Sequence, residues 1–215
     1  MDSVLKRRDF NLQTLALCAS TGLTIRVHAA SQQTLLVVGD SLSAEYGIAR
    51  GSGWVALLAA QLSQEKPTWQ VMNASISGET TAGGLARLDA LLKQHQPQLV
   101  VIELGGNDAL RGFSLRMTED NLVRMVQACQ AVKAKVLLIG MQVPPNYGAS
   151  YAKDFTQMFA RVAKEQKTSL VPFMLQGVAD TTDPTAMFQA DRIHPTAKAH
   201  PIILGHVWPV LKKML

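Results

Sequence analysis

The stretch Thr34-Leu35-Leu36-Val37-Val38-Gly39-Asp40-Ser41 is a short apolar run that ends abruptly in Gly-Asp-Ser. A run that is apolar at nearly every position, and not only at alternate ones, is typical of a strand covered on both faces. Such strands lie inside parallel sheets, where reactive residues follow the carboxyl ends of the strands. The stretch therefore predicts a buried parallel strand that places Ser41 on the rim of a sheet.

Four more apolar runs follow, and helix-length segments separate them. Further strands are predicted at Trp69–Asn73, Leu99–Leu104, Val136–Ile139 and Leu170–Phe173. Apolar residues recur at helical spacing over Trp54–Leu62, Thr81–Gln94, Thr118–Val132, Tyr151–Glu165 and Thr196–Leu211. Strands that alternate with helices predict an α/β fold, with a five-stranded parallel sheet covered by helices on both faces.

Polar and glycine residues follow three of these strands. Ser41 follows the first strand, Gly78 the second and Asn107 the third. The carboxyl ends of parallel strands meet at one edge of a sheet, so we expect these three residues to lie close together. His194 stands just before Pro195, which should open the last helix, and the same rim is therefore expected to carry His194.

Residues 1–29 have the features of a removable leader. Lys6-Arg7-Arg8 precedes a mildly apolar run over Leu12–Ile25, and Ala29 ends a segment that suits the small-residue rule for cleavage. Polar residues interrupt the run, whereas a membrane span needs roughly 18 or more apolar residues. We therefore predict a cleaved signal peptide, a hydrolase domain over 30–215, and no stable membrane anchor.

The leader indicates export to the periplasm or beyond in a Gram-negative bacterium, by one of two routes. Arg7-Arg8-Asp9-Phe10 resembles a twin-arginine signal. General secretion stays open as the alternative, because Lys6 and Asn11 depart from the usual twin-arginine pattern.

Charge and cysteine content narrow the class of protein further. The formal net charge is +5, but basic residues of the leader contribute to it, so the charge is no indication of a nucleic-acid partner. Once the leader is removed, Cys129 is the only cysteine and no intramolecular disulfide can form. A chain of this length is expected to build one hydrophobic core.

The residues of the predicted rim supply the parts of a serine hydrolase. A serine hydroxyl needs a neutral imidazole to accept its proton and a carboxylate to orient that imidazole. Asp191 precedes His194 by three residues, so one local turn can join them. Backbone N–H groups of Ser41 and Gly78, with the side chain of Asn107, can supply donors to a tetrahedral oxyanion.

Each of these residues also has an ordinary interpretation. Ser41 and Gly78 suit loops or turns, Asn107 suits a left-handed turn position, and Asp191 and His194 suit a solvated surface pair. Because the fold brings all of them to one edge, their joint occurrence favours catalysis over four separate coincidences.

In order along the chain, these residues stand in four blocks that resemble those of the SGNH (or GDSL) hydrolases. The blocks are Gly39-Asp40-Ser41-Leu42-Ser43, the segment around Gly78, Gly105-Gly106-Asn107-Asp108, and Asp191-Arg192-Ile193-His194-Pro195. Within the family, Glu103–Gly112 and Pro145–Gly148 are most similar to bacterial periplasmic thioesterases, lysophospholipases and arylesterases. The resemblance implies a flavodoxin-like three-layer α/β/α fold, with Ser41, Asp191 and His194 as the triad.

The implied activity is hydrolysis of carboxylic esters and thioesters through an acyl-Ser41 intermediate, without a cofactor. We expect a small-molecule substrate with an apolar acyl or aryl group, bound in a groove near the rim. Candidates for the groove are the apolar residues Leu110, Phe113, Met141, Pro144, Pro145, Tyr147, Met187 and Phe188. An esterase of acetylated sugars and a non-catalytic binding module on the same fold are the alternatives.

Two more aspartates stand beside predicted site residues. Asp40 and Asp108 are interpreted as braces of their loops that accept backbone N–H bonds. An aspartyl phosphatase would need a second aspartate two residues after the first, but position 42 is Leu. No metal site is expected, since the other histidines show no ligand spacing.

Overall fold

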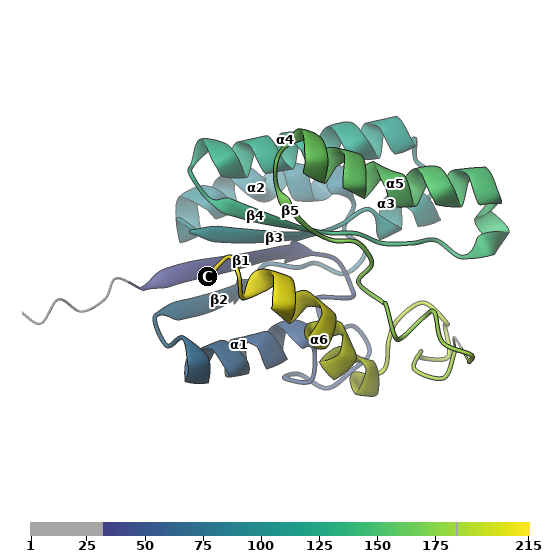
Figure 1. Ribbon diagram of the computed structural model, residues 1–215, viewed down its shortest axis with the longest axis horizontal. Helices are drawn as coiled ribbons and strands as arrows, with labels where there is room; N and C mark the ends of the chain where they lie inside the picture. The colour runs from purple at the N-terminus through teal and green to yellow at the C-terminus, as the bar shows by residue number, and fades with distance from the viewer. Residues whose placement is uncertain (1–31, 184) are drawn as a thin grey trace, which may run out of the picture. The chain divides into compact units, whose positions relative to one another are not determined.

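A parallel sheet of five strands organises the chain, as a computed structural model shows for residues 32–183 and 185–215 (Figure 1). The strands are β1 (Gln33–Gly39), β2 (Trp69–Asn73), β3 (Leu99–Glu103), β4 (Lys135–Ile139) and β5 (Ser169–Val171). All neighbouring strands are parallel and their order is β2-β1-β3-β4-β5. The predicted five-stranded parallel sheet is confirmed. The order reverses between β1 and β3, which is where open sheets of this kind bind ligands.

Helices cover both faces of the sheet, as the resemblance implied (Figure 1). One face carries α1 (Trp54–Glu65) and α6 (His200–Leu211), which contact each other. The other face carries α2 (Thr81–His95), α4 (Leu115–Ala131) and α5 (Ala149–Glu165). The α/β/α layering is confirmed.

Two helical segments differ from the prediction. A short helix, α3 (Gly106–Leu110), begins three residues after the end of β3, where the sequence predicted no helix. Five residues are too few to show a helical period of apolar residues. The last helix begins at His200 and not at Thr196, because a short 3₁₀ helix over Ala197–Ala199 comes first. Its start suits Pro201, whose fixed φ favours the first turn of a helix.

The core lies on both sides of the central strands. Leu35–Val38 of β1 and Leu99–Ile102 of β3 have no exposed side chain. Trp54 fills one layer, while Phe155 and Phe159 of α5 fill the other and contact each other edge to face. Complete burial of each large apolar side chain contributes about 1.5–3 kcal/mol. The apolar runs therefore hold the sheet that carries the rim.

A histidine of α6 caps α1 and ties this layer to the loop that carries Ser41. Gly53, at the N-cap position of α1, has no side chain to cap the helix, and the backbone N–H of Trp54 donates to Nδ1 of His200 at 3.0 Å. Burial lowers the pKa of His200, which keeps Nδ1 free to accept. The indole Nε1–H of Trp54 in turn donates to the Ser43 hydroxyl at 3.1 Å.

The predicted leader, residues 1–29, lies outside the described residues, so its cleavage and the domain boundary stay predictions. The described residues, 32–183 and 185–215, belong to one compact unit. No helix in the described part of the chain is long and apolar enough to cross a membrane.

Candidate active site

Ser41 stands in a tight turn at the carboxyl end of β1. The turn is closed by Asp40, whose Oδ1 accepts the Leu42 N–H at 3.0 Å and whose carbonyl accepts the Ser43 N–H at 3.2 Å. Gly39 leaves no room for a side chain, since a Cβ there would lie 2.8 Å from Oε2 of Glu103. The end of β1 therefore packs closely on the end of β3, and Ser41 is exposed at the rim by only 9%.

The structure brings the three predicted catalytic residues together. His194 Nε2 lies 2.9 Å from the Ser41 hydroxyl oxygen, and its Nδ1 lies 2.7 Å from Oδ2 of Asp191. An ionised carboxylate can only accept, so it favours the tautomer with the proton on Nδ1. Nε2 of His194 is then the acceptor for the proton of Ser41.

Asp191 is held in its charged form by a local turn, as the three-residue spacing predicted. Its Oδ1 accepts the backbone N–H of His194 at 3.0 Å and of Ile193 at 2.9 Å. The backbone N–H of His194, the His194 side chain and the N–H of Ile193 lower the pKa of Asp191 to about 2. Arg192 between them takes a left-handed conformation with φ of 57°. The carboxylate therefore stays ionised throughout the neutral range.

Two residues that sequence analysis missed hold the loop of His194 in place. The Tyr46 ring lies against the His194 ring, with centroids 4.3 Å apart and planes tilted by 38°. Gln189 donates from Nε2 to the carbonyls of Tyr46 at 2.9 Å and Pro195 at 3.1 Å, and its backbone N–H donates to the His194 carbonyl at 2.8 Å. Neither residue belongs to a motif, so no signal in the sequence could have found Gln189.

The predicted oxyanion donors follow three neighbouring strands. Asn107 lies in α3, and its Nδ2 donates one hydrogen to Oδ2 of Asp40 at 2.9 Å, which leaves its second hydrogen for another acceptor. Gly78 takes a left-handed conformation with φ of 77°, and its carbonyl accepts from the Arg111 guanidinium at 2.9 Å. Within the described residues, the N–H groups of Ser41 and Gly78 have no acceptor.

A cavity of about 800 Å³ opens beside Ser41, Asn107 and His194. Small-molecule sites commonly have this volume. Its apolar walls include residues from five parts of the chain: Leu42, Leu110, Met141, Val143, Pro144, Phe173, Leu175, Phe188 and Ile193. The segments after β4 and β5 lie far apart in the sequence and come together only in the folded chain. The sequence therefore did not identify Val143, Phe173 and Leu175 as groove residues.

Four of the eight residues predicted for the groove line this cavity, namely Leu110, Met141, Pro144 and Phe188. Phe113 and Tyr147 are not among its lining residues, and Met187 packs against the core. The Tyr147 ring instead stacks on Tyr151 with centroids 6.2 Å apart. Pro145 begins the short 3₁₀ helix over Pro145–Tyr147, and its side chain is outside the described ones.

The braces predicted for the two neighbouring aspartates are confirmed. Asp40 accepts the Leu42 N–H, and Asp108 accepts the Thr81 N–H at 2.9 Å. Asp108 is fully buried and also accepts from the Thr81 hydroxyl, so it ties α3 to the start of α2. Within residues 32–183 and 185–215, no group of three or more His, Cys, Asp or Glu side chains is placed to hold a metal ion.

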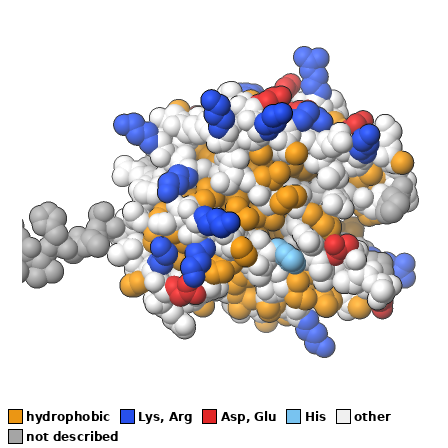
Figure 2. Space-filling model, viewed as in Figure 1, with side chains coloured by type: hydrophobic (Ala, Val, Ile, Leu, Met, Phe, Trp, Pro, Cys, Tyr) orange, Lys and Arg blue, Asp and Glu red, His pale blue; other side chains and the backbone are white. Residues whose placement is uncertain are grey.

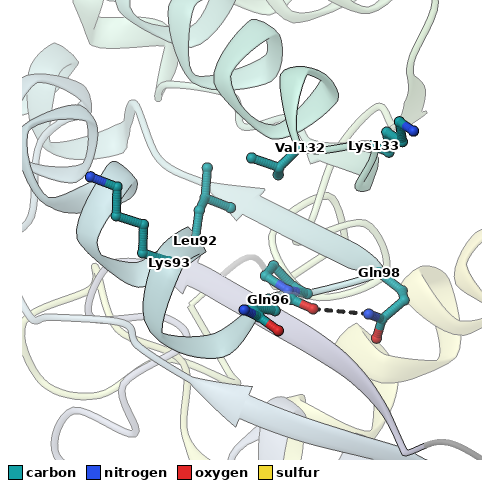
Figure 3. Close-up of a pocket in the computed structure, with 7 residues that line it drawn as sticks. Leu92, Lys93, Gln96, Gln98, Val132 and Lys133 are labelled. Atoms are coloured by element: carbon teal, nitrogen blue, oxygen red, sulfur yellow. Dashed lines mark hydrogen bonds between the residues drawn. The ribbon is translucent and has the colours of Figure 1, made fainter.

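A second cavity, of about 500 Å³, lies at the opposite edge of the sheet, between the ends of α2 and α4 (Figure 3). Figure 3 shows that the ammonium groups of Lys93 and Lys133 point to opposite sides, while Gln98 donates to the Gln96 carbonyl at 2.9 Å. None of the described side chains that line it is a carboxylate, an imidazole or a hydroxyl. This cavity offers no chemistry comparable to that of the rim.

Charge is dispersed over the face that Figure 2 shows. On the face in Figure 2, hydrophobic side chains gather across the middle, and lysines and arginines are scattered around and among them. This face therefore presents no single basic patch, and the chemistry is concentrated at the rim.

Comparisons with known proteins agree with this site. The model of the GDSL-like Lipase/Acylhydrolase family matches residues 37–202. Esterase TesA of Pseudomonas aeruginosa is 50% identical over 204 residues, which cover 95% of this chain and 100% of that protein. Thioesterase 1/protease 1/lysophospholipase L1 of Escherichia coli K12 is 45% identical over 185 residues, covering 84% and 83%. A crystal structure of TesA matches with a TM-score of 0.81 and 54% identity, covering 85% of this chain and 100% of that one.

Proposed function

The chain belongs to the GDSL-like lipase/acylhydrolase family, and on that premise we propose that it cleaves carboxylic esters and thioesters through an acyl-Ser41 intermediate. The observation that carries the proposal is the continuous contact from Asp191 through His194 to Ser41, with distances of 2.7 and 2.9 Å. Nucleophile, base and orienting carboxylate within hydrogen-bond reach are what acyl transfer requires.

Acylation begins when the Ser41 hydroxyl oxygen attacks the substrate carbonyl carbon and His194 Nε2 takes its proton. The charge that develops on the carbonyl oxygen is stabilised by the N–H groups of Ser41 and Gly78 and by the Asn107 amide. The imidazolium then protonates the leaving alkoxide or thiolate. Asp191 stays ionised and steadies the imidazolium, because its lowered pKa keeps it a carboxylate.

Deacylation repeats these steps with water as the nucleophile. His194 takes a proton from water, the hydroxide attacks the acyl carbonyl, and the proton returns to Ser41 as the free carboxylic acid leaves. No step calls for a group beyond these side chains and backbone amides.

The apolar lining of the cavity supports the proposal that the protein recognises an apolar acyl or aryl group of the substrate. Its walls beside Ser41 include Leu110, Met141 and Phe173. Each substrate methylene buried against such walls contributes about 0.8 kcal/mol. The names of the relatives, which include a thioesterase and lysophospholipase L1, agree with fatty acyl substrates. A sugar acetyl esterase would need more polar walls.

Labelling with a fluorophosphonate probe tests the mechanism. The probe is expected to label the protein, and Ser41→Ala should abolish labelling, because only an activated serine reacts. A parallel panel of p-nitrophenyl esters, an acyl-CoA and a lysophospholipid tests the substrate class. Labelling that persists in Ser41→Ala would overturn the role of Ser41, and a protein without any turnover would be a binding module.

Residues 1–29 are proposed to direct export to the periplasm. If Arg7 and Arg8 form a twin-arginine signal, replacing both with lysine should leave precursor in the cytoplasm, because that route reads arginine specifically. Fractionation of cells that express each form checks this. Normal export of the lysine variant would point to general secretion instead.

A further inference from the structure

We infer that Asp40 is a positioning residue that sets which way round the Asn107 amide lies, so that its nitrogen and not its oxygen faces the developing oxyanion. This inference rests on the proposed oxyanion role of Asn107. It gives the aspartate beside the nucleophile a task beyond closing the Ser41 turn.

Both oxygens of Asp40 are engaged by different parts of the site. Oδ1 accepts the N–H of Leu42 at 3.0 Å, within the turn of the nucleophile, and Oδ2 accepts from Nδ2 of Asn107 at 2.9 Å, from α3. Asp40 is only 2% exposed, so water does not compete for these contacts. One buried carboxylate therefore links the nucleophile to the proposed oxyanion donor.

The two ends of an amide have nearly the same shape but opposite hydrogen-bonding character. An ionised carboxylate can only accept, so it tolerates the nitrogen of Asn107 at 2.9 Å and repels the oxygen. The nitrogen carries a second hydrogen, which remains for the substrate oxyanion. A neutral partner at position 40 that both donates and accepts would permit the reversed amide, which would direct lone pairs at the oxyanion.

The charge on Asp40 depends on its surroundings. Burial raises the pKa of Asp40 to about 6, while the Leu42 N–H, the Asn107 amide and the charge of His194 oppose the rise. Two acidic groups face it: Asp108, whose charge raises this pKa further, and Glu103, whose Oε2 lies 3.3 Å from the Asp40 backbone nitrogen.

The buried carboxyl group of Glu103 also has a shifted pKa. Burial and the nearby Asp40 raise the pKa of Glu103 well above its usual range. Above about pH 6 Asp40 is thus the acceptor-only group that the inference requires. Below about pH 6 it gains a proton, can donate to the Asn107 oxygen, and no longer enforces one orientation.

A double-mutant cycle on kcat tests the coupling between the two residues. Asn107→Ala should lower kcat about 10²- to 10³-fold with little change in KM, as expected for an oxyanion donor. Asp40→Asn should lower kcat roughly 10-fold or more in the wild-type background, because the amide can now reverse. In the Asn107→Ala background, Asp40→Asn should cause no further loss, since no amide remains to orient.

Glu103→Gln is the matched control. The variant also replaces a buried carboxyl group beside the turn by an amide. Glu103 accepts from the Ser43 hydroxyl at 2.7 Å rather than from Asn107. Its effect on kcat should therefore be the same with and without the Asn107 side chain. A Glu103→Gln effect that vanished in Asn107→Ala would mean that general loosening, and not Asp40, couples to the amide, and would overturn the inference.

The pH dependence of kcat provides a second measurement that needs no variant at Asp40. The ratio of kcat between wild type and Asn107→Ala cancels any pH dependence that the two proteins share. This ratio should fall as pH drops through about 6, because protonated Asp40 no longer orients the amide. A ratio that is constant from pH 5 to 8 would overturn the inference, even if Asp40→Asn failed to fold.

Failure of the inference differs from failure of the proposed function. Equal losses from Asp40→Asn in both backgrounds would overturn the role of Asp40 and leave the oxyanion role of Asn107 intact. An unchanged kcat in Asn107→Ala would overturn both the oxyanion role of Asn107 and the positioning role of Asp40. If the fluorophosphonate probe failed to label the wild-type protein, that separate result would overturn the serine mechanism itself.

Discussion

Two aspartates stand on either side of Ser41, and their surroundings are opposite. Asp40 is 2% exposed and its pKa is raised to about 6 by burial, whereas the Asp191 side chain is 37% exposed and its pKa is lowered to about 2 by hydrogen bonds. The loop of Asp191 keeps its charge through a local turn. The turn of Asp40 is held by contacts with β3 and α3, from residues more than 60 positions away. Local hydrogen bonds stabilise the charge of one carboxylate, and burial opposes that of the other.

The largest effect on kcat should come from removing the side chain of Ser41 or of His194, the nucleophile and the base. Ser41→Ala and His194→Ala should each lower kcat by roughly 10⁵-fold or more, because nucleophile and base act as one unit. The double variant should be no worse than the single ones, as single-turnover assays with a p-nitrophenyl ester can measure. Multiplied losses in the double variant would mean that the two residues do not share a mechanism.

The second largest effect on kcat should come from removing the charge of Asp191, the exposed aspartate. Asp191→Asn should lower kcat by about 10⁴-fold, because the amide no longer favours the His194 tautomer that accepts from Ser41. The melting temperature should fall only slightly, because solvent screens the charge of this exposed residue and its turn can still accept backbone N–H groups. A strongly destabilised Asp191→Asn protein would break the contrast between the two carboxylates.

Asp40→Asn should raise the free energy of unfolding at neutral pH, in contrast to Asp191→Asn. The folded-state pKa of about 6 lies above the usual value of 3.8, so the folded protein binds this proton more tightly than the unfolded chain does. The resulting stability is present in full below pH 3.8 and is lost as pH rises through about 6. At about 1.4 kcal/mol per unit, Asp40→Asn recovers at most about 3 kcal/mol at pH 7.

Urea unfolding of both proteins at pH 4 and pH 7 checks the sign of this effect. The difference between them should be small at pH 4 and should favour the variant at pH 7. A variant that is less stable at both values would show that the hydrogen bonds of the carboxylate outweigh the effect of its burial.

The smallest expected effect concerns the cavity wall next to the Asp40–Asn107 pair. Leu110 lines the cavity, so Leu110→Ala should lower kcat/KM for octanoate esters several-fold more than for acetate esters, as each buried methylene contributes at most about 0.8 kcal/mol. Tyr147→Ala is the control, because its ring stacks on Tyr151 outside the cavity lining. Equal losses at every chain length for Leu110→Ala would place the acyl chain elsewhere.

The predicted groove shows where sequence reasoning reaches its limit. Leu110 and Phe113 stand three positions apart in similar surroundings of sequence, yet only Leu110 lines the cavity. Leu110 ends α3, which is too short to leave a periodic pattern, and Phe113 lies beyond this helix. Phe173, in the segment after β5, also lines the cavity, and nothing in its neighbourhood in the sequence marks it as a site residue.

The sequence by itself determined the sheet, the rim and the local turn of the base. Apolar runs identify buried strands because both faces of a parallel sheet exclude water, and the spacing of Asp191 and His194 specifies a contact that one turn can make. Only the tertiary structure decided that Gln189 and Tyr46 hold the His194 loop, that His200 caps α1, and that Asp40 meets Asn107. These contacts join residues from 67 to 148 positions apart or lie in irregular loops, where no period of the chain encodes which side chains will meet.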